Sequence, residues 1–122
     1  MKKLLVFASL SEGAAGLVLL AYPPIVARLL FNEETAGTGI IMGRVAGISL
    51  IALGLACWPD NNTLRAFYGM LTYSLLVMLY CAIVGVSGEV GTLLWPAVAF
   101  HAILSVLLWR AWSIERKAPV AD

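Results

Sequence analysis

Four long apolar stretches dominate the chain, and short polar or turn-forming segments separate them. The stretches cover about residues 4–22, 36–58, 64–86 and 90–112. Each is close to the ~20 residues that an α-helix needs to cross a bilayer. The separators contain residues that end helices, namely Pro23-Pro24, Pro59-Asp60-Asn61-Asn62 and Ser87-Gly88-Glu89. The pattern therefore predicts an all-α membrane protein, an up-down-up-down bundle of four transmembrane helices in a single domain over residues 1–122.

Two further segments do not fit a membrane span. Residues 24–31 are mostly apolar but too few to cross a bilayer. Proline suits a first helical turn, and Arg28 can face water while its apolar neighbours face lipid or protein. We expect a short interfacial helix there. Residues 113–122 are polar, and we expect this tail to fray.

The composition supports a membrane protein and limits its chemistry. Of 122 residues, 61% are hydrophobic and 12% charged, against about 45–50% and about 25% in soluble domains. A net charge of +1 offers no basic surface for nucleic acid. Cys57 and Cys81 have no metal-binding or haem spacing around them, so we expect two core residues and no metal site. No phosphate loop or nucleophile elbow occurs, which argues against an enzyme, although an intramembrane enzyme needs only a few central residues.

Charged residues outside the spans predict the orientation. In a four-span chain, one side holds only Arg28 against Glu33, Glu34 and Glu89. The other side holds most of the basic residues, which are Lys2, Lys3, Arg65, Arg110, Arg116 and Lys117. Because basic loops stay inside, both termini are expected in the cytoplasm.

A layer of polar residues crosses the middle of the predicted bundle. Its members are Glu12, Arg44, Tyr73, Ser74 and His101. A buried arginine costs ~2.5–3.5 kcal/mol on insertion scales, so we expect Glu12 to pair with Arg44 through two parallel hydrogen bonds. Tyr73 and His101 would take the remaining donors and acceptors. The layer either fixes helix register only or lines a cavity for a ligand or a proton.

Small residues predict where helices approach one another. Gly39, Gly43 and Gly47 recur every four residues and form a packing groove on the second span. Its partner is either a helix of the same chain, which favours a self-contained binding protein, or a second copy, which favours a homo-oligomer. Ala8, Ser9 and Gly16 share the helical face of Glu12, so this face is expected to point into the bundle.

Three segments resemble the small four-span bacterial inner-membrane proteins called DoxX-like. They are Glu12-Gly13-Ala14-Ala15-Gly16, Pro23-Pro24 and Gly43-Arg44-Val45-Ala46-Gly47. The resemblance implies a bacterial cytoplasmic membrane, and some such proteins are similar to subunits of quinone-linked oxidoreductases or membrane redox complexes. We expect a protein that binds a partner or an apolar ligand, such as membrane lipid or a quinone, and requires no further cofactor. The alternatives are a subunit of an oligomeric transporter or channel and an accessory subunit of a redox complex.

Overall fold

The computed structural model describes residues 1–118, and that part of the chain consists of α-helices and their connections. The helices are α1 (Lys2–Ala21), α2 (Pro23–Phe31), α3 (Thr38–Ala56), α4 (Thr63–Ser87) and α5 (Leu94–Lys117). All except α2 are long and apolar enough to cross a membrane, which indicates an integral membrane protein. The predicted all-α class with four spans and one short helix after the first span is confirmed.

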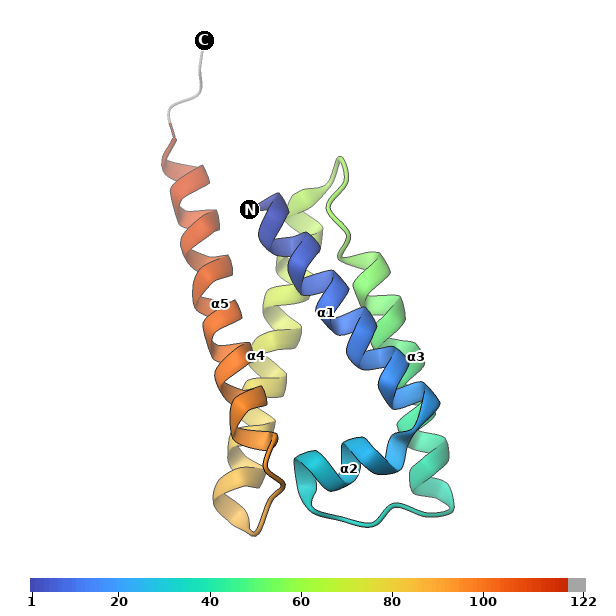
Figure 1. Cartoon of the computed structure of the whole chain (residues 1–122). Helices are drawn as coiled ribbons and strands as arrows, with labels where there is room; N and C mark the ends of the chain where they lie inside the picture. Colours follow the sequence, from blue (N-terminus) through green and yellow to red (C-terminus); the bar gives the residue numbers. More distant parts are fainter. Residues whose placement is uncertain (119–122) are drawn as a thin grey trace.

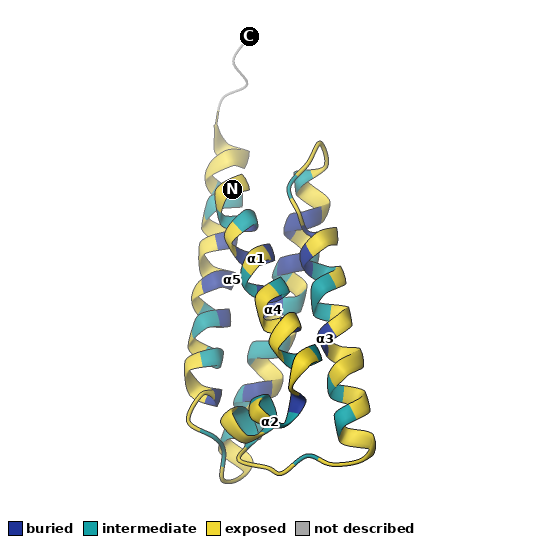
Figure 2. Cartoon of the chain, turned by 45° about the vertical axis from the view of Figure 1, so that its right-hand side comes forward, coloured by how far each residue is buried: buried dark blue, intermediate teal, exposed yellow. Residues whose placement is uncertain are grey.

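The long helices are arranged as two antiparallel pairs (Figure 1). Helix α1 packs mainly on α3, and α4 packs mainly on α5. Helix α2 lies across the end of the bundle opposite to Met1, between the two pairs. The outer faces of the long helices are mostly exposed (Figure 2), and many large apolar residues are among the exposed ones. This is the arrangement expected of helices whose surroundings are lipid.

Glycines allow α1 and α3 to touch through their backbones. A Cβ atom added to Gly47 would lie 2.6 Å from the amide nitrogen of Leu20 and 2.7 Å from the carbonyl oxygen of Gly16. One added to Gly54 would lie 2.7 Å from the carbonyl oxygen of Ser9. Only residues without a side chain permit such an approach, so these glycines determine which face of α3 meets α1.

The predicted glycine groove is therefore used within the chain, with one exception. Gly43 continues the contact, since its added Cβ would lie 2.7 Å from the Pro23 side chain. Gly39 does not: it is exposed, and its added Cβ would meet only the side chain of Thr35. The expectation for Gly39 was wrong because the first turn of α3 extends beyond the last turn of α1.

The connection between α4 and α5 is attached to α2. The amides of Gly91 and Leu93 donate hydrogen bonds of 3.1 and 2.9 Å to the carbonyls of Leu30 and Leu29, respectively. These carbonyls belong to the last turn of α2 and have no partner within their own helix. A Cβ on Gly91 would overlap the Leu29 carbonyl. Because the amides of Gly91 and Leu93 are bonded to α2, α5 begins at Leu94 and not at the predicted residue 90.

Residues 113–117 continue α5, so the expectation of a frayed tail was wrong for this part. The Met1 amino group forms an ion pair of 2.9 Å with Glu115. Trp112 stacks on Phe67 with ring centroids 5.8 Å apart, and the Arg116 guanidinium lies 5.2 Å from the Trp112 ring. Through these contacts the last turns of α5 are attached to Met1 and to Phe67 of α4. Residues 119–122 of the predicted tail lie outside the described part.

The apolar core occupies the half of the bundle that holds Met1. It consists of Leu5, Ala8, Cys57, Ala66, Phe67, Met70, Leu104 and Leu108. Cys57 and Cys81 are both buried and free, as expected of core residues. Toward the opposite end the two helix pairs diverge and α2 fills the space between them (Figure 1). The polar residues described next lie between this core and α2.

Candidate functional site

Glu12 lies in the interior of the bundle, on the buried face of α1. That face carries Leu5, Ala8, Ser9, Glu12 and Gly16. The spacing of three and four residues places them on one side of the helix, and the small residues among them, Ala8, Ser9 and Gly16, let neighbouring helices come close. Glu12 is only 3% exposed. The expected inward orientation of this face is confirmed.

His101 from α5 faces Glu12 in the interior of the bundle. The Glu12 Oε1 atom lies 3.9 Å from the His101 Nδ1 atom, and His101 is 8% exposed. This separation exceeds the 2.7–3.2 Å typical of a hydrogen bond. The two groups therefore face each other without a direct hydrogen bond, and a further polar group beside both can bridge them.

The predicted ion pair between Glu12 and Arg44 is wrong. Arg44 is exposed on α3, and within residues 1–118 it forms no ion pair. The reason is geometric: Gly43 and Gly47 occupy the contact with α1, and the next residue on a helix is rotated by about 100°. Arg44 lies about 9 Å inside the start of α3, and helical side chains lean toward the N-terminus. Its guanidinium can therefore extend toward the nearer membrane interface.

The imidazole ring of His101 packs in T-shaped contact with the rings of Tyr73 and Phe100. The Tyr73 and His101 ring centroids are 5.8 Å apart at 78°, and those of Phe100 and His101 are 5.3 Å apart at 81°. The hydroxyl of Tyr73 lies beside the Glu12 carboxyl group. Tyr73 thus contacts both members of the Glu12–His101 pair, which brings three of the predicted layer residues together.

Three buried polar atoms in this region have no hydrogen-bond partner among the described residues. They are Ser9 Oγ, Ser74 Oγ and His101 Nδ1. Ser105 differs, because its hydroxyl donates a 2.8 Å hydrogen bond to the His101 carbonyl. An unsatisfied buried polar group costs about 1–3 kcal/mol. Ordered water or the polar group of a bound molecule can supply the missing hydrogen bonds.

An apolar groove lies beside the polar residues, between α1, α2 and α3. The groove is open on one side and has a volume of about 730 Å³. Its lining is almost entirely apolar and includes Leu19, Pro23, Val26, Phe31, Gly43 and Tyr73. Small-molecule sites typically measure about 300–1,000 Å³. Tyr73 reaches this groove from α4 and also contacts Glu12 and His101. The apolar groove and the polar cluster therefore meet at one side chain.

The groove could not be found from the sequence because α2 forms one of its walls. The apolar residues Val26, Leu30 and Phe31 predicted an interfacial helix, but not the face that this helix covers. Only the packing of α2 across the diverging helix pairs turns these side chains toward Gly43 and Tyr73. The Pro23-Pro24 pair is the local signal that the chain turns sharply at this point.

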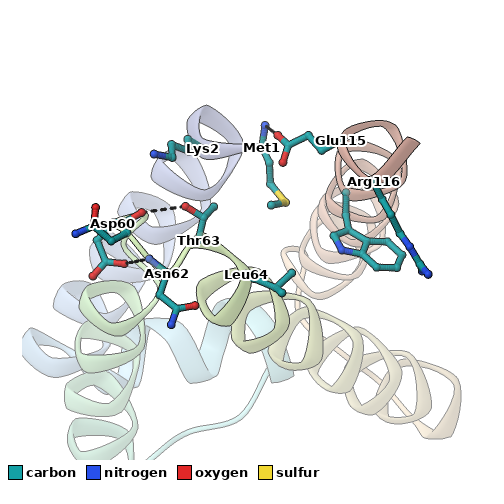
Figure 3. Close-up of a pocket in the computed structure, with 10 residues that line it drawn as sticks. Met1, Lys2, Asp60, Asn62, Thr63, Leu64, Glu115 and Arg116 are labelled. Carbon is teal, nitrogen blue, oxygen red and sulfur yellow. Dashed lines mark hydrogen bonds and ion pairs between the residues drawn. The ribbon is translucent and has the colours of Figure 1, made fainter. Parts of the chain in front are cut away.

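A second hollow of about 640 Å³ lies at the end of the bundle that holds Met1 (Figure 3). Its lining mixes both signs of charge and includes Lys2, Asp60, Glu115 and Arg116. Several of these groups already have partners: Glu115 pairs with Met1, and Asp60 accepts a 2.7 Å hydrogen bond from the amide of Asn62. The hollow therefore offers no concentrated charge for a ligand.

No cluster of three or more His, Cys, Asp or Glu side chains that could hold a metal ion occurs in the described part of the chain. Comparisons with known proteins find no match, either to a family model, to a curated protein or to a solved structure.

Proposed function

We propose that this protein binds an amphipathic small molecule within the membrane. The apolar part of the ligand lies in the groove between α1, α2 and α3, and its polar end reaches Tyr73 and the Glu12–His101 pair. The observation that carries the proposal is the position of Tyr73, which lines the groove and contacts both buried titratable groups. A ligand of this kind gains apolar burial and hydrogen bonds in one position.

The packing of the glycines supports a site contained in one chain. Gly43 and Gly47 contact α1 and Pro23, so they are not available for a second copy. A homo-oligomeric transporter or channel would have to form through other surfaces. One of these is the exposed side of α3, which carries Arg44. Binding within the chain is the function that more of the described geometry supports.

The distribution of basic residues supports an orientation for the site. Lys2 and Arg116 line the hollow at the end that holds Met1, and Arg65 follows shortly after the start of α4 at the same end. By the positive-inside rule this end lies on the cytoplasmic side of the membrane. The groove is lined by α2, which lies at the other end of the bundle, so it opens toward the non-cytoplasmic leaflet. The DoxX-like resemblance adds a bacterial inner membrane to the proposal, together with a role beside a membrane-protein partner such as a redox complex.

A photoreactive long-chain alcohol tests the binding proposal. The purified protein in lipid nanodiscs is labelled with a diazirine-bearing hexadecanol, and the labelled residues are identified by peptide mass spectrometry. We expect saturable labelling of residues lining the groove, such as Val26 and Met42, that unlabelled hexadecanol competes away. Labelling that is uniform over all lipid-facing residues and does not saturate would contradict a specific site.

Two matched variants locate the site. Ala46 and Ala14 are both exposed alanines in long helices. Ala46 lines the same groove as Tyr73, whereas Ala14 lines a separate, smaller groove of about 350 Å³ between α1 and α3. Ala46→Phe is expected to reduce saturable labelling by about tenfold, since an added aromatic ring occupies the ligand volume. Ala14→Phe is expected to leave it unchanged. Equal effects of the two variants would place binding elsewhere.

A further inference from the structure

The polar residues that meet the groove at Tyr73 include an acidic group but no lysine or arginine. Glu12 from α1 faces His101 from α5 and Tyr73 from α4, with Ser9 on the same face of α1. Arg44, the basic residue nearest the middle of a span, is exposed on α3, outside the face that Gly43 and Gly47 turn toward α1. A ligand with an anionic head would bring a negative charge into the interior of the bundle, where no lysine or arginine lies beside it to compensate the charge.

The hydrogen-bonding capacity of these groups is mixed. The carboxyl group of Glu12 accepts hydrogen bonds, and the Tyr73 hydroxyl both donates and accepts. His101 Nδ1 and Ser9 Oγ are buried and have no partner among residues 1–118. The 3.9 Å between Glu12 and His101 leaves a position beside both atoms for a third polar atom. A group that donates and accepts at the same time satisfies more of these atoms than a pure acceptor.

A neutral hydroxyl has both properties. It can donate to the Glu12 carboxyl group while it accepts from Tyr73 or Ser9, and it carries no charge into the interior. An ionised carboxylate or sulfonate offers acceptors only, and a hydrocarbon offers neither. Because buried polar groups left without partners are costly, a site built for a hydroxyl discriminates strongly against analogues that lack it.

We propose that the site selects long-chain molecules with a neutral hydroxyl or phenol head over anionic amphiphiles of equal chain length. This inference rests on the proposed function and adds the chemical class of the ligand. The absence of a lysine or arginine beside these residues disfavours the anion, and Tyr73 and Glu12 together bind the hydroxyl. Ser105, whose hydroxyl bonds to its own helix, takes no part in this recognition.

Competition against the photoreactive hexadecanol tests the selection. Unlabelled hexadecanol, hexadecane and hexadecanesulfonate are compared in nanodiscs at equal membrane concentration; the sulfonate is chosen because it stays ionised across the working pH range. We expect hexadecanol to compete at least about tenfold better than either analogue. If the groove is labelled but the sulfonate competes as well as the alcohol, the head-group proposal is refuted and the binding proposal survives. Absence of saturable labelling in the groove refutes both.

Two variants separate a role in recognition from a role in folding. Glu12→Gln is expected to bring the sulfonate to within about threefold of the alcohol, because the amide group offers N–H donors to the sulfonate oxygens where the carboxyl group offers mainly acceptors. Tyr73→Phe provides an independent test, since it keeps the ring but should reduce the preference for alcohol over hydrocarbon by about tenfold. Ser105→Ala is the matched control and is expected to leave both ratios unchanged. Wild-type ratios in both the Glu12 and Tyr73 variants would overturn the assignment of the head group to these residues.

Discussion

Replacement of Gly47 by alanine tests the packing that positions the whole site. The added methyl carbon would lie 2.6 Å from the Leu20 amide nitrogen and 2.7 Å from the Gly16 carbonyl oxygen, whereas ordinary contacts begin near 3.4 Å. Both neighbours are backbone atoms of α1, so no side chain can move aside, and the two helices must separate. Overpacking of this kind costs about 1–3 kcal/mol, which exceeds the gain of about 0.8–1.0 kcal/mol from replacing glycine by alanine in a helix.

Gly13→Ala is the matched control for this variant. Gly13 lies in the middle of α1, and an added Cβ there meets no atom within 4 Å. It should be neutral or stabilising by up to about 1 kcal/mol. The unfolding free energies of both variants are measured by titration with sodium dodecyl sulfate in mixed micelles, and we expect Gly47→Ala to be the less stable by about 2 kcal/mol. Equal stabilities would refute the backbone contact between α1 and α3.

Two further changes test other contacts. Gly91→Ala should release the α4–α5 connection from α2, because an added Cβ overlaps the Leu29 carbonyl, and should therefore accelerate hydrogen exchange at the Leu93 amide. Gly88→Ala is the control: an added Cβ there meets no atom within 4 Å, so exchange at Leu93 should not change. A double-mutant cycle of Glu12→Ala and His101→Ala should give a coupling energy of about 0.5–3 kcal/mol in unfolding measurements. The cycle of Glu12→Ala with Arg44→Leu should give no coupling. Coupling in the second cycle and none in the first would show that Glu12 pairs with Arg44 after all.

The sequence predicted the features that depend on local pattern. Apolar length located the four spans, and the proline pair marked the start of α2. The small residues beside Glu12 correctly indicated a buried face, because helical periodicity places Ala8, Ser9 and Gly16 next to it. Burial of this face follows from spacing alone and needs no knowledge of the partner helix.

The pairing of charges could not be predicted in the same way. Residue position gives the depth of Glu12 and Arg44 in the membrane, but not the direction in which each side chain points around its helix. That direction is set by Gly43 and Gly47, which turn their own face of α3 toward α1 and so leave Arg44 outside. The same glycines were identified from the sequence, but their partner was not, and the error about Arg44 follows from this gap.

Nuclear magnetic resonance of His101 gives the most direct test of ligand binding at the buried pair. The chain contains one histidine, so protein with ¹⁵N-labelled histidine, freed of any affinity tag, gives signals from this imidazole alone. Titration of the protein in nanodiscs with hexadecanol is predicted to shift the Nδ1 signal saturably, whereas hexadecanesulfonate at the same membrane concentration leaves it in place. A signal that hexadecanol does not move, or that both amphiphiles move alike, would contradict a hydroxyl-binding site at Glu12, Tyr73 and His101.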